Sequence, residues 1–413
     1  MSTNKTDRVI LHCDCNSFFA SVEAALNPAY RNVPMAVCGS VEDRHGIVLA
    51  KNELAKKYGI KTAETVYSAK RKCKDLVIAE PHYDEYSRYS RKLNEIYSRF
   101  TDLVEPFGID ESWLDVTASI KHFGSGREIA EQIRAAVKSE LGVTVSIGVS
   151  FSKVFAKLGS DYKKPDAITE ITRENYKSLA YPLPVSDMIY VGSKTAAALQ
   201  KMGIRTIGEL AGSNMTFLSS KLGKHGEHIY LCACGLDNSP VVPPISESTK
   251  SISNGFTFRH NLLLQNEWKI GIDYLSESLG EKLRKHKQKC KTVSLSIKDE
   301  QLHTIQRQRP QNPPTDISRE IAETAYSILL DEWTEGRPIR MITVTVANLI
   351  SSNTAGTQLD FFSEENSNKR EKGKKIENAV DKIRQRYGGE AIIHGSIIDT
   401  DIGIYDKKTK EKQ

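Results

Sequence analysis

The sequence predicts an α+β protein that is divided into several domains. Three patterns carry this prediction: strands and helices alternate through the first 160 residues, short helices separated by glycine fill residues 167–237, and the order βαββαβ follows from residue 251. A chain of 413 residues also exceeds what one hydrophobic core usually organises, since domains typically hold about 100–200 residues. Its hydrophobic content of 39% excludes wholesale disorder.

The first 160 residues are expected to form a sheet covered by helices. Apolar runs predict strands at 9–15, 35–38 and 143–150, and helical spacing predicts helices at 18–26, 84–100 and 128–140. Between residues 104 and 117 two strands flank the turn Gly108–Glu111. The first strand therefore ends next to a carboxylate, Asp14, and the turn carries two more.

Residues 167–237 are expected to form short helices. Ser193–Met202 is helical in pattern, Gly203 is suited to a left-handed helix end, and Thr206–Glu209 is a capping box that starts the next helix. This pattern is typical of a helix–hairpin–helix motif, whose exposed helix N-terminal amides grip one backbone phosphate without reading sequence. The alternative is a plain helical hairpin.

After a linker at Pro240–Glu247, the order βαββαβ predicts a ferredoxin-like domain. Strands are expected at 251–258, 292–299, 303–309 and 340–349, and helices at 267–285 and 316–333. Val293, Leu295 and Ile297 alternate with polar residues, so both helices should cover one apolar face. The opposite face is expected to be polar, cationic and open, which suits a duplex backbone.

The net charge of +6 is small, but positive charge is concentrated at 282–291, where six Lys and Arg occur without an acid. Such a run favours contact with a phosphate backbone over a solvated helix end. From Gly356 the chain is polar, and 363–375 is expected to be a solvated segment, followed by a helix at 376–387 and an apolar stretch at 391–398.

Seven cysteines without a Cys-x-x-Cys pair predict reduced, mostly buried thiols. His225, His228 and Cys232 share a helical face and could be drawn as a zinc site, but they lack the usual ligand spacing and are interpreted as packing. No apolar run reaches the ~18 residues that would cross a bilayer, and the first residues have no apolar signal core. A cytoplasmic location is therefore expected.

Three carboxylates are candidates for a metal centre. Asp14 ends the first strand, and Asp110 and Glu111 lie together in a strand–turn–strand. Carboxylates in this arrangement can hold two Mg²⁺ ions roughly 3.5–4 Å apart, which activate a hydroxyl and stabilise a leaving pyrophosphate. Neighbours in a flat strand point to opposite faces, so a turn or bulge must re-aim Asp110 or Glu111.

Three segments resemble the catalytic motifs of the Y-family (DinB/UmuC-like) translesion DNA polymerases: Asp14–Glu23, Gly108–Asp115 and Ser146–Leu158. The resemblance implies a right-hand fold with a palm sheet, small fingers, a helix–hairpin–helix thumb and a βαββαβ little finger. The implied domains are a palm at 1–35 and 78–166, fingers at 36–77, a thumb at 167–240, a linker at 241–249, a little finger at 250–355 and a tail at 356–413.

The resemblance also implies roles for individual residues. Asp14, Asp110 and Glu111 would be catalytic and hold two Mg²⁺ ions, with the backbone carbonyl of Cys15 as a further ligand. Phe18 and Phe19 would lie at the nucleotide, with Phe19 as a steric gate against a 2′ hydroxyl. Lys56 and Lys164 would meet the triphosphate. Many members have Tyr and Arg where this chain has Glu53 and Lys56, and a lysine lacks the bidentate fork of arginine.

The polar tail contains a peptide that looks like a sliding-clamp-binding motif, with a glutamine anchor and apolar residues that would fill a pocket: Gln358, Leu359, Phe361 and Phe362. Two adjacent exposed phenylalanines beside a charged segment are hard to explain as core. The alternative is a strand edge that docks on the little finger. A tether to the clamp would raise the concentration of a weakly processive polymerase at the primer end.

Together these observations predict a template-directed DNA polymerase that adds dNTPs to a primer 3′ hydroxyl opposite damaged bases. Its expected partners are primer–template DNA, dNTP and a sliding clamp, and it is expected to be a monomer. Two other classes remain as alternatives: a non-catalytic DNA-binding relative that recruits the clamp, and a palm-domain nucleotide cyclase. The cyclase has no use for a helix–hairpin–helix or a clamp peptide.

Overall fold

The structure is a computed structural model, and it describes residues 8–40, 46–244, 249–352, 364–398 and 400–404. The chain divides into two compact units, one of Met1–Gly39 and Ile47–Ile245 and one of Ser40–Gly46 and Ser246–Gln413. Both units mix helices and strands, so the predicted α+β class is confirmed. Within the described ranges, no helix combines the length and apolar character needed to span a membrane.

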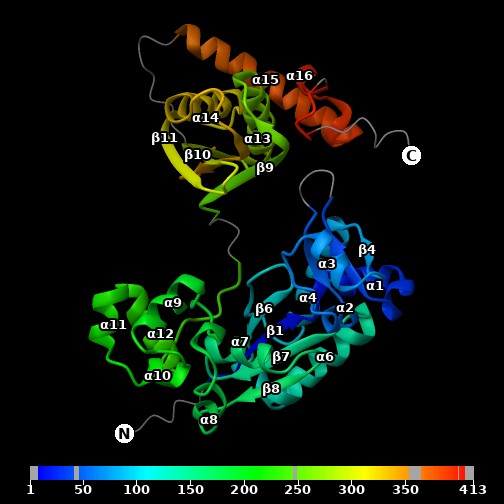
Figure 1. Ribbon diagram of the computed structural model, residues 1–413, viewed down its shortest axis with the longest axis vertical. Helices are drawn as coiled ribbons and strands as arrows, with labels where there is room; N and C mark the ends of the chain where they lie inside the picture. Colours follow the sequence, from blue (N-terminus) through cyan, green and yellow to red (C-terminus); the bar gives the residue numbers. More distant parts are fainter. Residues whose placement is uncertain (1–7, 41–45, 245–248, 353–363, 399, 405–413) are drawn as a thin grey trace. The chain divides into compact units, whose positions relative to one another are not determined.

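A five-stranded sheet forms the centre of the first unit (Figure 1). Its strand order is β5-β6-β1-β7-β8, and all neighbours are antiparallel except β7 and β8. The strands are β1 (Ile10–Cys15), β5 (Val104–Pro106), β6 (Glu111–Asp115), β7 (Val145–Ser150) and β8 (Ile168–Ile171). The strands predicted at 9–15 and 143–150 and the pair around Gly108–Glu111 are confirmed.

Helices cover both faces of this sheet. On one face Leu11 and Cys13 of β1 share a core with residues of α1, α4 and α6, while α7 packs on the other face against β1 and β7. The bounds are α1 (Phe18–Leu26), α4 (Tyr83–Tyr97), α5 (Ile120–Phe123), α6 (Gly126–Leu141) and α7 (Lys153–Tyr162), with a 3-10 turn η2 (Thr117–Ser119). Alternate side chains of β1 therefore enter different environments.

A smaller sheet of order β3-β2-β4 stands beside α1. Its elements are η1 (Pro28–Asn32), β2 (Met35–Cys38), β3 (Val48–Lys51), α2 (Glu53–Lys57), α3 (Val66–Lys72) and β4 (Val77–Ala79). Asn52 caps α2 through its side chain, which accepts from the amide of Ala55.

Short helices complete the first unit: α8 (Tyr176–Ala180), η3 (Val185–Asp187), α9 (Ser193–Lys201), α10 (Ile207–Ala211), α11 (Met215–Leu222) and α12 (Lys224–Ala233). The capping box at Thr206 and Glu209 is present, and Gly203 has the positive φ of 82° that a helix end of this kind requires. The paired helices predicted at this place, α9 and α10, are thus confirmed.

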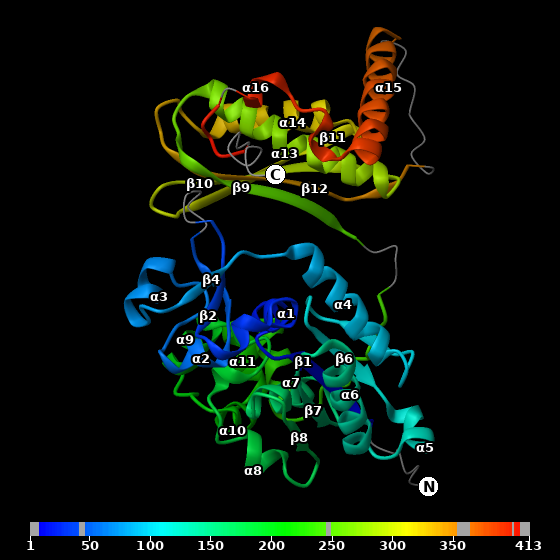
Figure 2. The ribbon, with the colours of Figure 1, turned by 90° about the vertical axis from the view of Figure 1, so that its right-hand side faces the viewer.

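The second unit confirms the order βαββαβ. It consists of β9 (Ser251–Leu262), α13 (Gln265–Lys285), β10 (Gln288–Lys298), β11 (Thr304–Thr315), α14 (Ser318–Glu332) and β12 (Ile339–Ala347), with β13 (Ile350–Ser351) at one end. The strands lie in the order β11-β10-β12-β9, and Figure 2 shows both helices on one face. Val293, Leu295 and Ile297 are buried beneath them, as the alternation predicts.

Residues 364–375, which were expected to be a solvated segment, belong to a helix. Helix α15 runs from Glu364 to Tyr387 and is followed by η4 (Gly389–Ala391) and α16 (Gly395–Ile398). The helix docks through charge: the guanidinium of Arg370 binds the carboxylate of Glu320, and Asp381 binds Arg284. A charged docking face has no apolar periodicity, so the sequence pattern did not reveal it.

The same contacts correct the interpretation of one residue in the basic run at 282–291, while Lys282, Lys285, Lys287 and Lys291 are exposed. Arg284 is only 10% exposed and pairs with Glu377 and Asp381 of α15, so it is not available to a phosphate backbone. On the polar face of the sheet, Ser294 is 4% exposed and its hydroxyl donates to the carbonyl of Arg307, whereas Ser296 and Lys298 are partly exposed.

Candidate active site

Asp14 and Glu111 face each other across two paired strands. In the antiparallel register of β1 and β6, Asp14 lies opposite Glu111 and His12 lies opposite Trp113. Because Leu11 and Cys13 point into the core, Asp14 emerges on the face that α7 covers, where it is only 7% exposed. Ligand atoms of His12, Asp14 and Glu111 all lie within 4.8 Å of one another.

Asp110 lies in the bend before β6 and is therefore not a strand neighbour of Glu111. The amide of Cys15 donates to the carbonyl of Asp110 over 3.1 Å, which ties the bend to the end of β1. Burial and the charges of Asp14 and Glu111 raise the pKa of Asp110 to about 6. Because Asp110 lies in a bend and not in the strand, it does not have to point to the face opposite Glu111. Asp110 is not part of the group formed by His12, Asp14 and Glu111.

Two lysines neutralise these carboxylates. The ammonium nitrogen of Lys157 lies 2.7 Å from Oε2 of Glu111 and 3.0 Å from Oδ2 of Asp14, and that of Lys164 lies 2.9 Å from the same Asp14 oxygen. A third carboxylate, Asp161, contacts both ammonium groups at 3.2 and 2.8 Å. Burial alone would lower the pKa of Lys157, but the negative charges of Asp14 and Glu111 outweigh it and raise this pKa.

The cluster fits a divalent metal ion. Carboxylate oxygens are the ligands that Mg²⁺ and Mn²⁺ prefer, and Asp14 and Glu111 offer them from two strands that fix their spacing. The carboxylates concentrate negative charge at this place on the sheet, which is why the ammonium groups of Lys157 and Lys164 lie here. A bound cation would offset the repulsion between Asp110 and the charges of Asp14 and Glu111, which, after burial, raises the pKa of Asp110.

Sequence reasoning did not single out Lys157 or His12. Lys157 lies within the segment Ser146–Leu158 that suggested the family, but no role was predicted for it. His12 precedes Asp14 by two residues on β1, so the period-2 rule for strands could have placed it on the same face. A hydrogen bond from His12 is the main cause that lowers the pKa of Glu111 to about 2.

The ring of Phe19 is held by aromatic neighbours at the start of α1. It stacks on Tyr86 of α4 with a centroid distance of 4.1 Å and an interplanar angle of 12°, and Tyr83 meets its edge at 6.2 Å. Tyr86 in turn donates from its hydroxyl to Glu23, which is 2% exposed. Phe18 is buried in the core, at 4% exposure, so of the two rings Phe19 is the more accessible.

Lys56 lies apart from the carboxylate cluster on α2. Its ammonium nitrogen is 2.5 Å from Oε1 of Glu53, which also accepts from the hydroxyl of Ser17 at 3.3 Å. No ion pair within the described ranges joins Lys56 to Asp14 or Glu111. The structure therefore brings Lys164 to the cluster and leaves Lys56 exposed on the neighbouring small sheet.

Two other predicted sites have different outcomes. The clamp peptide Gln358–Phe362 lies outside the residues that the structure describes. At the candidate zinc ligands, Cys232 is fully buried in the core of α8–α12 and its sulfur lies 3.7 Å from Nε2 of His228. Among the described residues, His12, Asp14 and Glu111 form the one group of three or more possible ligands that lie this close together, and His225, His228 and Cys232 do not form another.

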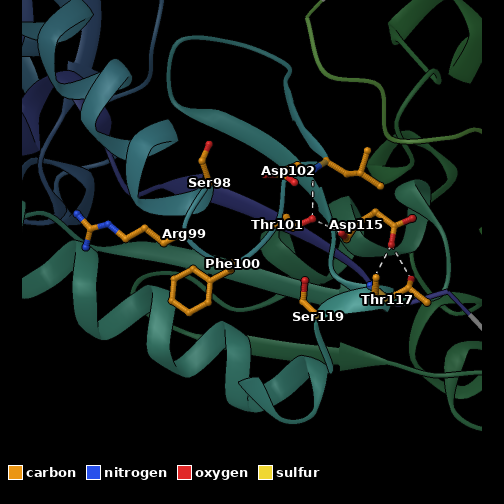
Figure 3. Close-up of a pocket in the computed structure, with 10 residues that line it drawn as sticks. Ser98, Arg99, Phe100, Thr101, Asp102, Asp115, Thr117 and Ser119 are labelled. Atoms are coloured by element: carbon orange, nitrogen blue, oxygen red, sulfur yellow. Dashed lines mark hydrogen bonds between the residues drawn. The ribbon is translucent and has the colours of Figure 1, made fainter. Parts of the chain in front are cut away.

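A separate surface pocket of about 570 Å³ lies where α4 leads into β5 (Figure 3). It is lined by Ser98–Leu103 and by Asp115, Thr117, Ala118 and Ser119. The carboxylate of Asp115 accepts from both the amide and the hydroxyl of Thr117. The pocket contains none of the predicted site residues.

Comparisons with known proteins agree with the motifs. Residues 13–161 match the impB/mucB/samB family and residues 249–361 match the impB/mucB/samB family C-terminal domain. DNA polymerase IV of Acetivibrio thermocellus is 47% identical over 392 residues, which cover 95% of this chain and 98% of the relative. DNA polymerase IV 1 of Bacillus subtilis is 34% identical over 403 residues, covering 98% and 95%.

A solved structure of a Y-family DNA polymerase chimera shares the fold. Its TM-score is 0.74 at 23% sequence identity, and the match covers 83% of this chain and 99% of that chain.

Proposed function

Because the chain belongs to the impB/mucB/samB family of Y-family DNA polymerases, we propose that Asp14, Asp110 and Glu111, with the backbone carbonyl of Cys15, hold two Mg²⁺ ions for nucleotidyl transfer. The protein is a DNA-directed DNA polymerase that performs translesion synthesis, with primer–template DNA and dNTP as its substrates. The observation that carries the metal assignment is the register of β1 and β6, which sets Asp14 against Glu111.

Divalent cations at such a site supply Lewis acidity that lowers the pKa of the primer 3′ hydroxyl and stabilises charge on the transferred phosphate and the leaving pyrophosphate. The chain itself orients these groups. Asp14 reaches the site from β1 and Glu111 from β6, so the sheet fixes the spacing of the two carboxylates. Asp110 approaches from the bend, where burial and the charges of Asp14 and Glu111 raise its pKa, and a bound cation would offset the repulsion among these acids.

Lys164 is suited to steady the triphosphate. Its ammonium is shared between Asp14 and Asp161, so Asp161 would keep Lys164 at the edge of the site if Asp14 held a cation. A lysine is a mobile point charge that meets phosphate from several directions. Lys56 would approach the same phosphates from the fingers, where it now pairs with Glu53.

Phe19 is proposed as the steric gate. Its stacking on Tyr86 fixes the plane of the ring, and a fixed ring can exclude a 2′ hydroxyl that a mobile side chain would accommodate. Phe18 supports it from the core, with ring centroids 5.7 Å apart.

The domain assignment is proposed along the same lines: a palm at 1–35 and 78–166, fingers at 36–77, a thumb at 167–240, a linker at 241–249, a little finger at 250–355 and a tail at 356–413. The turns between α9 and α10 would grip the DNA backbone. We further propose a monomer in the cytoplasm that binds a sliding clamp through Gln358–Phe362.

Primer extension tests the metal site. Asp110→Ala should abolish nucleotide addition and leave binding of a fluorescent primer–template unchanged, since the proposed role of the side chain is to hold metal and not to contact DNA. The matched control is Asp102→Ala, an exposed aspartate in the loop before β5, which should extend primers like the wild type. Near-normal extension by Asp110→Ala would disprove the assignment.

A further inference from the structure

Glu23 is a buried carboxylate that the proposed metal chemistry does not use. It lies on α1, one turn after Phe19, and is only 2% exposed. One of its oxygens accepts the hydroxyl of Tyr86, and the carboxylate oxygens lie 2.9 and 3.0 Å from Nδ1 of His82. Because a carboxylate loses its hydration on burial, it depends on such partners. Both partners belong to the start of α4, so Glu23 joins α1 to this helix.

Tyr86 is held at both ends of its side chain. Its ring is fully buried and stacks on Phe19, with centroids 4.1 Å apart, while its hydroxyl donates to Glu23. The ring of Tyr83 meets both of these rings edge-on, at 5.8 Å from Tyr86 and 6.2 Å from Phe19. Aromatic contacts tolerate a range of offsets, whereas a hydrogen bond to a carboxylate is directional and strong. The bond to Glu23 therefore fixes the position of Tyr86 more closely than the stacking does.

The packing around Phe19 matters because a steric gate works by resisting displacement. An rNTP carries one more oxygen than a dNTP, and at such a gate it fits only if the ring is displaced. Tyr86 covers one face of that ring at an interplanar angle of 12°, and is itself fixed by Glu23. Protein interiors are close-packed, so a fixed neighbour limits the movement of the ring that rests on it. Loss of the bond should loosen the gate without removing it.

We propose that Glu23 is a positioning residue for sugar selection: it holds the hydroxyl of Tyr86, and Tyr86 holds the ring of Phe19 where it excludes a 2′ hydroxyl. The inference rests on the proposed function, because it needs Phe19 to be the steric gate. Glu23 and Tyr86 are both buried, so they act through Phe19 and do not touch the nucleotide.

The test measures sugar discrimination, which is the ratio of kcat/KM for a dNTP to that for the matching rNTP in single-nucleotide addition. A purely structural role would lower both values together and leave their ratio unchanged. Tyr86→Phe keeps the ring and removes the hydroxyl, and should lower the ratio by about three- to tenfold, the usual effect of one hydrogen bond. Phe19→Ala, which removes the gate itself, should lower the ratio further.

Two substitutions of Glu23 separate its role as an acceptor from its bulk. Glu23→Met has a side chain of similar length but no carboxylate, and should lower the ratio as Tyr86→Phe does. Glu23→Gln keeps an amide oxygen that can accept the same hydroxyl, so its ratio should lie closer to that of the wild type. The double variant Glu23→Met/Tyr86→Phe should match the single variants, since all of them remove one bond.

A second double variant tests whether Tyr86 acts through the gate. Phe19→Ala/Tyr86→Phe should show the same ratio as Phe19→Ala, because without the ring of Phe19 there is nothing for Tyr86 to hold. The matched control is Tyr97→Phe, which removes another buried tyrosine hydroxyl from α4. No group in the described part of the chain hydrogen-bonds to that hydroxyl, so the ratio should stay at the wild-type value.

A wild-type ratio in either Tyr86→Phe or Glu23→Met would overturn the proposal, as would a lower ratio in Phe19→Ala/Tyr86→Phe than in Phe19→Ala. If Glu23→Met does not fold, Tyr86→Phe decides alone. Failure of the proposed function looks different: Phe19→Ala itself would then discriminate like the wild type, which would overturn the gate and the inference together.

Discussion

Gly148→Ala tests whether the close packing of α7 on β7 positions the active site. The added Cβ would lie 1.9 Å from the carbonyl oxygen of Ala156, whereas ordinary contact begins near 3.4 Å, so α7 must move by about 1.5 Å. The atoms it meets are backbone, which cannot rotate away. Overpacking of this kind destabilises a fold by about 1–3 kcal/mol.

The same movement carries Lys157 and Ser160 away from Asp14 and His12, because both lie on α7. A displacement of about 1 Å can cost about 100-fold in rate, so single-turnover primer extension should slow by that order. Urea unfolding measures the loss of stability on the same sample. Gly192→Ala is the matched control, since no atom lies within 4 Å of its added Cβ and its φ of -73° suits any residue.

Gly148→Ala with wild-type extension and an unchanged urea midpoint would refute this reasoning. A loss of stability without a loss of rate would show that α7 packs closely but does not position the chemistry.

Three further predictions concern other parts of the molecule. Phe19→Ala should let the enzyme add ribonucleotides, lowering its preference for dNTP over rNTP by at least about tenfold in single-nucleotide kinetics, and an unchanged preference would exclude the gate. Arg284→Met leaves Glu377 and Asp381 partly buried without their partner, so it should destabilise the docking of α15 by about 3–5 kcal/mol and speed proteolysis of residues 364–387. Arg127→Met, on an exposed face, should have neither effect, and equal proteolysis of the two variants would contradict the prediction. A hydrogen bond to Glu23 raises the pKa of His82, so the pair stabilises the fold below pH 6.5 and loses that stabilisation as pH rises through the raised pKa. The unfolding temperature of His82→Gln should therefore differ from that of the wild type more at pH 6 than at pH 9. A difference that does not change with pH would show that the pair is not its cause.

Much of the fold could be predicted because it follows local patterns. A short apolar run located β1, the alternation of apolar and polar residues located β10 and β12, and the capping box at Thr206 located the start of α10. The motifs around Asp14 and Gly108–Glu111 also identified two strands that proved to be paired. These features need only a few neighbouring residues to be recognised.

What the sequence missed depends on contacts between distant segments. His12 and Ser160 are 148 residues apart, and only the packing of α7 over Gly148 brings them together. The helix predicted at 376–387 forms the second half of α15, but its first half was missed because residues that dock it, such as Arg370, are charged and look solvated in a linear pattern. Its partner Arg284 was assigned to DNA for the same reason.

The most direct test of the account is primer extension by the purified chain alone on a template with one abasic site. With Mg²⁺, the wild type should insert a nucleotide opposite the lesion and extend beyond it, EDTA should stop the reaction, and Asp14→Asn should bind the primer–template without inserting. Wild-type protein that binds the primer–template but adds no nucleotide, or Asp14→Asn that extends like the wild type, would contradict the account.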